Sequence, residues 1–234
     1  MQCGIDHLVV VASTLDSGVQ WCEATLGVKP APGGEHEQFG THNRLIKIAT
    51  PTHPLAYLEI IAVNPQAGPR TLLAPRWFDM DDPALQAAVA QAPRLVHFDA
   101  NISDIDAARA ALLAQGIEPG APLQCSRPSQ RGLLQWRITL REDGQRLFHG
   151  ALPSLIQWGA PGSPDPLRLH PRNSLARSGV ALKSVTVVHP QADQLRAAYT
   201  SIGLHGISVE HGPAKLRATL NTPKGPVLLD SQGI

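Results

Sequence analysis

The chain has 234 residues, of which 43% are hydrophobic and 17% charged, and its formal net charge at pH 7 is +1. This length allows one domain or two small ones with a sizeable core, and the composition excludes a disordered chain. Because lysines and arginines are scattered along the sequence, we expect neither nucleic acid nor a membrane surface as the main partner.

The cysteines give no sign of a disulfide framework or a metal site. Cys3, Cys22 and Cys125 are far apart and have no metal-ligand spacing. The simplest setting for such a chain is a reducing compartment. The sequence also lacks a basic N-terminal region followed by a long apolar run, and no apolar stretch reaches the ~20 residues of a membrane span. We therefore expect a cytoplasmic protein.

Residues 1–63 predict the order strand, helix and three strands. A β-branched run at 5–11 predicts the first strand. Ser13, with Asp16 three residues later, predicts the start of a helix that ends at Gly27. The following segments are predicted as a short strand at 28–29, a turn-rich loop at 30–40, and strands at 45–48 and 57–63.

A proline-rich segment at 64–93 interrupts this pattern and is predicted to be a connector that packs on the first unit. Within it, Asp82 and Pro83 predict an N-cap and the first turn of a short helix that ends near Gln91.

The order strand, helix and three strands then recurs twice. In each copy the helix is predicted to end at a glycine, at Gly116 and Gly203 as at Gly27. A spacing of about 90 residues between copies indicates a repeated supersecondary unit. The predicted divisions are a domain of two units at 1–160 (about 1–63 and 94–158), a linker at 161–178, and a third unit at 179–234. Within the second unit we predict strands at 94–102, 134–140 and 154–158, a short strand suggested by the fragments 117–118 and 123–124, and a helix capped by Ser103. Within the third unit we predict strands at 185–188, 206–209, 216–220 and 227–229 and a helix opened by His189-Pro190.

The expected fold is α+β, with repeated βαβββ units forming curved mixed sheets around a concave pocket. One unit covers a single face of its sheet with its helix, so two units placed edge to edge leave a concave inner face suited to a small molecule. The third unit is expected either to pack on the other two or to complete a cup in a homodimer.

Two strands of the first unit each carry one side chain able to bind a metal or move a proton. His7 opens the first apolar run, and Glu59 lies inside the apolar run 57–61. A carboxylate among large apolar residues is costly unless it is paired. The two residues are therefore predicted to form a metal or proton-transfer pair. The alternative is structural: His7 hydrogen-bonds its neighbours, and Glu59 pairs with His7 or Arg44.

Further candidates lie on other predicted strands. Arg44 and Arg137 occupy strand positions where an arginine suits recognition of an anionic substrate, a carboxylate or phosphate, or else is a solvated edge charge. Asn43 is predicted to face the cavity, and Trp136 to form its wall. His97 alternates with apolar neighbours, as a core histidine does, and His36 and His42 are predicted as site or surface residues.

Taken together, several motifs resemble the vicinal oxygen chelate superfamily, which has the βαβββ fold of glyoxalase I, extradiol dioxygenases and bleomycin-resistance proteins. Within it the sequence is most similar to the glyoxalase-like domain group. The resemblance covers residues 1–160, and residues 180–234 only through the unit pattern. The motifs are Ile5-Asp6-His7-Leu8-Val9, Gly33-Gly34-Glu35-His36, Gly40-Thr41-His42-Asn43-Arg44, Tyr57-Leu58-Glu59-Ile60-Ile61, Leu134-Gln135-Trp136-Arg137 and Pro153-Ser154-Leu155-Ile156-Gln157-Trp158.

The resemblance implies a divalent metal held by His7, Glu59 and His97. Two histidines and one carboxylate suit Fe(II), Mn(II), Ni(II) or Zn(II). Gln157 falls at the fourth ligand position, where it is a poor substitute for a carboxylate, and it is assigned to substrate binding. In the third unit, Ser184 and Asp230 lie near the matching positions.

The implied function is that of a small-molecule enzyme with lyase, isomerase or dioxygenase chemistry. A metal at His7 and Glu59 would polarise a substrate oxygen, and Glu59 would move a proton. The alternative is a metal-free protein that binds and sequesters a small molecule, as bleomycin-resistance proteins do. A weaker third option is a structural relative without a ligand.

Overall fold

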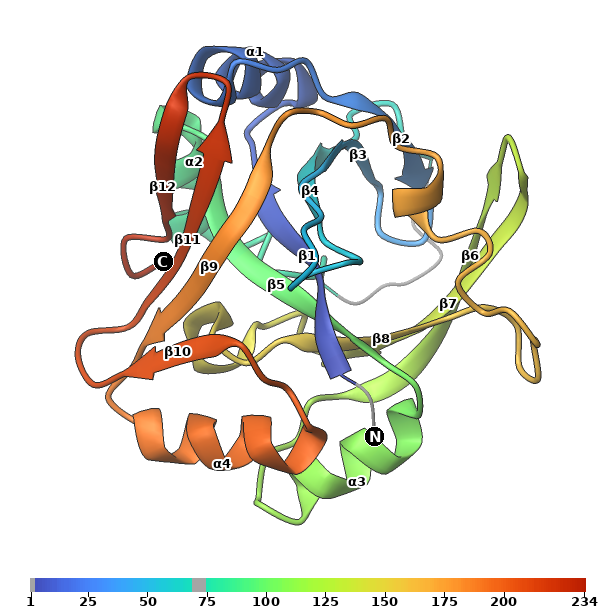
Figure 1. Cartoon of the computed structure of the whole chain (residues 1–234), viewed down its shortest axis with the longest axis vertical. Coiled ribbons are helices and arrows are strands. Elements are labelled where there is room, and N and C mark those ends of the chain that lie inside the picture. Colours follow the sequence, from blue (N-terminus) through green and yellow to red (C-terminus); the bar gives the residue numbers. More distant parts are fainter. Residues whose placement is uncertain (1–2, 69–74) are drawn as a thin grey trace.

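Among residues 3–68 and 75–234, which the computed structural model describes, three units repeat the order strand, helix and three strands (Figure 1). The predicted α+β fold of repeated βαβββ units is therefore confirmed. The first unit comprises β1 (Cys3–Val11), α1 (Leu15–Leu26), β2 (Ala31–His36), β3 (Thr41–Lys47) and β4 (Tyr57–Val63). The second comprises β5 (Arg94–Ile102), α3 (Ile105–Leu113), β6 (Ala121–Ser129), β7 (Gly132–Leu140) and β8 (Ser154–Trp158).

Units one and two form one curved sheet of eight strands, in the order β2-β3-β4-β1-β5-β8-β7-β6. The units join where β1 and β5 pair antiparallel, with His7 opposite Asp99. In each unit the first strand also pairs in parallel with the last, β1 with β4 and β5 with β8. The two edge strands, β2 and β6, contact each other. The sheet thus nearly closes around its concave face.

The third unit comprises β9 (Ala181–Val188), α4 (Ala192–Ile202), β10 (Ile207–Glu210), β11 (Lys215–Thr222) and β12 (Gly225–Asp230). It forms a separate sheet in the order β10-β9-β11-β12. The sheet order differs from that of the other units, because the parallel partner of its first strand is β10 rather than its last strand. The element order is therefore repeated three times, but the strand pairing only twice.

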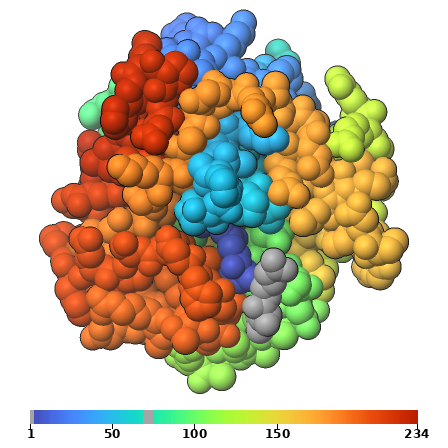
Figure 2. Space-filling model, viewed as in Figure 1, coloured from blue at the N-terminus to red at the C-terminus, as the bar shows by residue number. Residues whose placement is uncertain are grey.

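The third unit packs on the other two through a shared core. The backbone N–H of Leu182 donates to the carbonyl of Ile48 at 2.9 Å, and the hydroxyl of Tyr199 donates to the carbonyl of Ala151. One cluster of buried apolar side chains includes residues of β1, β5, β9 and β11. In Figure 2 the third unit, in orange and red, and the segment before it enclose residues of the first unit, in cyan, on one face of the molecule.

Local signals located some helix ends to within a residue, but α3 ends at Leu113 rather than at Gly116, and α4 begins at Ala192 rather than at His189-Pro190. Thr14, not Ser13, is the N-cap of α1, because its hydroxyl accepts the backbone N–H of Ser17 and the Ser17 hydroxyl completes the capping box. Likewise Asp104, not Ser103, caps α3. Gly27 ends α1 in the left-handed conformation (φ 74°), as predicted.

Two edge strands were underestimated from the sequence. The predicted strand at 28–29 is not one, and β2 lies inside the predicted loop at 30–40. Similarly, β6 is longer than its predicted fragments. Prolines and glycines are tolerated on an edge strand because one row of its backbone groups is unpaired. The register of β2 shifts between Pro32 and Glu35, which accommodates the intervening glycines.

The connector contains the predicted helix, α2 (Pro83–Gln91), with the Asp82 carboxylate accepting the N–H groups of Ala84 and Leu85. Residues 69–74 of this connector lie outside the described residues. None of the described helices is long and apolar enough to cross a membrane.

Candidate functional site

A pocket lies on the concave side of the large sheet, where units one and two meet. Its walls are largely aromatic and apolar, with acidic, histidine and arginine side chains among them. Its free volume of about 30 Å³ holds one or two water molecules, so a substrate must displace lining side chains to enter. The lining residues are His7, His36, Asn43, Leu45, Tyr57, Glu59, Trp77, Phe78, Asp99, Arg127, Leu134, Trp136, Ile138, Ile156, Trp158 and Pro171.

The imidazole of His7 lies between carboxylates on both of its nitrogens. Nδ1 is 2.8 Å from Asp6 Oδ1, and Nε2 is 2.9 Å from Asp99 Oδ2 and 3.6 Å from Glu59 Oε2. The ring also stacks on Tyr57, with centroids 4.5 Å apart. Burial by itself lowers the pKa of His7, but the carboxylates of Asp99 and Asp6 outweigh it and hold that pKa well above its usual range. Carboxylate oxygens at both ring nitrogens therefore favour the protonated form of His7.

Glu59 is held by Asn43 and by the glycine pair of β2. The Asn43 side-chain amide donates to Glu59 Oε1, and Asn43 Oδ1 accepts the backbone N–H of Gly34 at 2.7 Å. A side chain on Gly33 would overlap Asn43, so this glycine is needed for the close approach of the two strands. Burial raises the pKa of Glu59, and the positive charge of His7 and the Asn43 hydrogen bond oppose that rise only in part.

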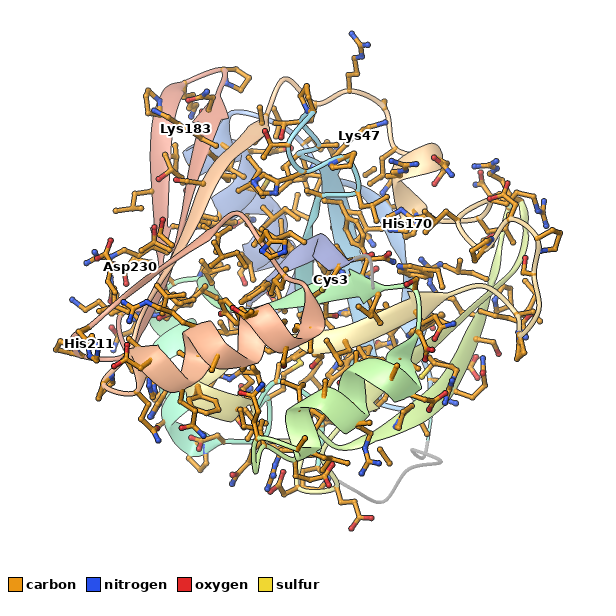
Figure 3. All side chains as sticks on the ribbon, turned by 60° about the horizontal axis from the view of Figure 1, so that its bottom comes forward. Cys3, Lys47, His170, Lys183, His211 and Asp230 are labelled. Atoms are coloured by element: carbon orange, nitrogen blue, oxygen red, sulfur yellow. The ribbon has the colours of Figure 1, made fainter. Side chains whose placement is uncertain are left out.

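Asp6 links the site to the segment between the two sheets. It accepts the indole N–H of Trp158 at 2.8 Å and a hydrogen bond from His170 Nε2 at 3.1 Å. Figure 3 labels His170 beside the strands of the first unit. Burial by itself raises the pKa of Asp6, but His170 and His7 outweigh it and hold the pKa well below its usual range. The predicted linker thus supplies part of the site.

His97 and Asp99 lie on the same strand, but they have different surroundings. His97 Nε2 accepts the backbone N–H of Ser154 at 3.0 Å, and burial, with help from Arg146 and His7, lowers the pKa of His97 to about 3. The buried Oδ1 of Asp99 has no hydrogen-bond partner among the described residues. Burial raises the pKa of Asp99 despite the charge of His7.

The implied metal ligands do not fit a metal ion in this arrangement. The lone pair of His97 Nε2 is used by Ser154, and His7 Nε2 is hydrogen-bonded to Asp99. Among residues 3–68 and 75–234, no group of three or more His, Cys, Asp or Glu side chains has the geometry to hold a metal ion.

Strand alternation separates the predicted site residues into two groups. His7, Asn43, Glu59, Trp136 and His36 line the pocket, whereas Arg44, Arg137, Gln157 and His42, each next to a pocket residue on its strand, do not. His97 is the exception, because it lies two positions from Asp99 on β5 and yet outside the pocket. Neighbouring residues on a strand point to opposite faces, so Trp136 and Trp158 face the pocket and the residues beside them face the helices.

The residues outside the pocket have structural partners. Arg137 forms a bidentate pair with Asp106 of α3, and Gln157 Oε1 accepts the N–H of Ile105 at the start of that helix. Arg44 donates to the Asn43 carbonyl. In the third unit, Asp230 pairs with Arg217 at 2.9 Å.

Several residues of the site, among them Asp99, Arg127 and His170, are not among those predicted from the sequence. Asp99 had a signal, because it lies two positions after His97 and so on the same face of the strand. Arg127 and His170 had none, since they lie in an underestimated edge strand and in a predicted linker. Arg127 brings a guanidinium into the pocket, a role that the sequence predicts for Arg44 or Arg137.

A family model described as "Glyoxalase-like domain" matches residues 5–203. A solved structure of a hypothetical protein from Staphylococcus aureus is similar over 91% of this chain and 88% of its own, with 16% identity and a TM-score of 0.61, which shows a shared fold. No curated protein sequence matches the chain.

Two methylmalonyl-CoA epimerases are more distantly similar. The Streptomyces coelicolor protein, in complex with 2-nitronate-propionyl-CoA, has 20% identity and a TM-score of 0.41 over 67% of this chain and 97% of its own. The Mycobacterium tuberculosis protein has 17% identity and a TM-score of 0.39 over 67% of this chain and 89% of its own.

Proposed function

The chain belongs to the glyoxalase-like domain family of the vicinal oxygen chelate superfamily. We propose that it is a small-molecule enzyme that removes and returns a proton at a carbon next to a carbonyl group. The observation that supports this most directly is the pairing of Glu59 with the buried imidazolium of His7 in an aromatic pocket. Proton abstraction next to a carbonyl group is the first step of many isomerase and lyase reactions.

Glu59 is the proposed base. Asn43 fixes its Oε1, which leaves Oε2 to approach a substrate C–H group. A carboxylate whose pKa is raised by burial is a better base, and its acid form still returns the proton. One carboxyl can therefore take the proton from one position and return it to another.

His7 is proposed to stabilise the charge that the transfer creates. When Glu59 becomes neutral, the negative charge passes to the substrate as an enolate oxygen. The imidazolium, 3.6 Å from Glu59 Oε2, stays in place and interacts with this charge in a site with little water. Asp6 and Asp99 keep His7 protonated and oriented.

Dioxygenase chemistry receives less support from these contacts. It would need the two-histidine, one-carboxylate ligand set that the resemblance implies, and Nε2 of His97 already accepts a backbone hydrogen bond. Proton transfer needs only a base and a nearby cation.

The test is deuterium exchange. We expect the wild type in D2O to exchange the α-protons of at least one member of a panel of 2-oxo acids, 2-hydroxyketones and acyl thioesters, followed by proton NMR. Glu59→Gln should lower the rate by about 10²- to 10⁴-fold, whereas the control Glu35→Gln, an exposed residue of β2, should not. EDTA should leave the rate unchanged.

Three outcomes would contradict the proposal. Deuterium exchange that persists in Glu59→Gln would show that Glu59 is not the base. Loss of exchange in EDTA, with recovery on adding Zn(II), Mn(II), Ni(II) or Fe(II), would establish the metal-dependent alternative. Binding of panel members without exchange would instead support the metal-free binding protein.

A further inference from the structure

Arg127 is the cation of the pocket that the proposed proton transfer does not use. It comes from β6, the edge strand that meets β2 where the large sheet nearly closes. Its side chain is half-buried and lines the pocket. Among residues 3–68 and 75–234, the side chain of Arg127 has neither a hydrogen bond nor an ion pair. The other pocket cation, His7, is bound on both nitrogens.

The backbone opposite Arg127 leaves room for it. A Cβ atom on Gly34 would lie 2.5 Å from Arg127 Nη1 and 2.7 Å from Cζ, so the guanidinium packs directly against this glycine. The backbone N–H of the same glycine donates to Asn43, which holds Glu59. One glycine therefore positions both the proposed base and the free guanidinium.

Two further polar atoms of pocket-lining residues lack hydrogen-bond partners, although Asp99 Oδ1 lies 3.6 Å from His97 Nε2. The indole Nε1 of Trp77 and the Oδ1 of Asp99 are buried, and neither has a hydrogen-bond partner among the described residues. Such atoms are satisfied in native proteins by water or a ligand. A ligand with acceptor oxygens would suit the donors of Arg127 and Trp77.

We propose that Arg127 binds the carboxylate group of the substrate, and that the substrate is a small apolar monocarboxylate with its body between the tryptophans of the pocket. A guanidinium presents two parallel N–H groups that match a carboxylate. The walls contributed by Trp77, Trp136 and Trp158 are apolar, and the reacting carbon faces Glu59. This assignment rests on the proposed function for the role of Glu59.

A single negative charge fits the pocket better than two. Glu59 and Asp99 line the same pocket, and Glu59 interacts electrostatically with Arg127. A phosphate monoester carries about 1.5 to 2 negative charges at pH 7, so part of its charge would be repelled by these carboxyls. We therefore expect the carboxylate to bind and the phosphate ester not to bind.

The experiment compares matched ligands by calorimetry or saturation-transfer NMR. Benzoate is paired with benzamide, butyrate with butyramide, and phenyl phosphate serves as the dianion. The wild type should bind each carboxylate about 10- to 100-fold more tightly than its amide, and phenyl phosphate no better than the amide. Arg127→Gln should abolish the preference, and Arg127→Lys should restore part of it.

Two control pairs separate this role from general damage. Arg131→Gln changes an exposed arginine of the same hairpin and should keep the full preference. Gly34→Ala should reduce the preference, because the added methyl group displaces the guanidinium, whereas Gly4→Ala should not, because a Cβ there meets no atom within 4 Å.

The outcomes distinguish this proposal from the proton-transfer function. Equal binding of acid and amide by the wild type, tighter binding of phenyl phosphate, no binding of any probe, or a preference that survives Arg127→Gln would each overturn the carboxylate assignment. If the wild type and Glu59→Gln both prefer carboxylates but the wild type exchanges no α-protons, the proton-transfer function is overturned and the carboxylate assignment stands.

Discussion

At the residue scale, the chemistry of the site depends on histidines that burial and neighbouring charges drive in opposite directions. His7 contacts carboxylates at both nitrogens and is held protonated. His97, two residues before Asp99 on β5, accepts a backbone hydrogen bond, and burial lowers its pKa to about 3. The same strand pair thus holds one charged and one neutral imidazole, each fixed by hydrogen bonds.

The lowered pKa of His97 predicts that the free energy of unfolding decreases in acid. Its ordinary pKa is 6.5 and its folded pKa is about 3, so between these values the unfolded chain binds a proton that the folded chain does not. Stability from a neutral His97 is complete above pH 6.5 and falls as the pH decreases, by about 1 kcal/mol per pH unit. Glutamine can still accept the Ser154 hydrogen bond without titrating.

Urea unfolding of the wild type and His97→Gln at pH 7.5, 6.5, 5.5 and 4.5 measures this decrease. The difference in unfolding free energy should move in favour of the variant as the pH falls below 6.5. The control Phe98→Leu, a buried residue without a titratable group, should lower stability equally at each pH. Parallel pH profiles for the wild type and His97→Gln would contradict the prediction.

At the element scale, α1 holds the outer face of the strand that carries Glu59. Glu59 faces the pocket, whereas its neighbour Ile60 faces the core beneath the helix. Gly18, in the middle of α1, is buried, and a Cβ there would overlap the Ile60 side chain. The glycine that weakens the helix by its propensity therefore lets the helix approach the strand.

Helix propensity and packing predict opposite effects for Gly18→Ala. Alanine is better than glycine inside a helix by about 1 kcal/mol, but overpacking of a tight core costs about 1–3 kcal/mol. We expect a net destabilisation of about 1 kcal/mol, measured by urea unfolding. The control Gln20→Ala, on the exposed face of α1, should change stability by less than about 0.5 kcal/mol. A more stable Gly18→Ala variant would show that propensity outweighs packing here.

At the scale of the whole molecule, the third unit completes the core of the other two. The helices α3 and α4 lie side by side (Figure 1), and the side chain of Gln115 donates to the Ala197 carbonyl between them. Leu195 of α4 is fully buried in the cluster that also contains Leu8 of β1 and Phe98 of β5. A core shared in this way predicts that the units unfold together, so the division into a domain at 1–160 and a third unit stays a prediction to be tested.

Leu195→Ala tests this cooperativity, because all four tryptophans lie in residues 1–160. The cavity should cost about 2–5 kcal/mol, and the urea midpoints detected by tryptophan fluorescence and by far-ultraviolet circular dichroism should fall together. Gln194→Ala, a half-buried neighbour on α4, should leave both midpoints nearly unchanged. A fluorescence midpoint unaffected by Leu195→Ala would instead show that the third unit unfolds independently.

The sequence by itself determined the elements and one contact of the site. Capping residues, glycines at helix ends and the period of the apolar residues act over two to four positions, so the helices and most strands could be predicted. The repeat also predicted that the first and last strands of a unit meet, and His7 and Glu59 lie 3.6 Å apart.

Only the tertiary structure decided the rest of the site. The antiparallel pairing of β1 with β5 brings Asp99 to His7, the contact of the two sheet edges brings Arg127 to Gly34, and the segment between the sheets brings His170 to Asp6. Arg137 and Gln157 lie one position from pocket residues and point away from it. Strand order and closure depend on the sum of contacts between residues far apart in the chain, and a shift of one residue reverses the face of a strand. Local sequence signals therefore predict the elements, but they do not specify which side chains meet in the pocket.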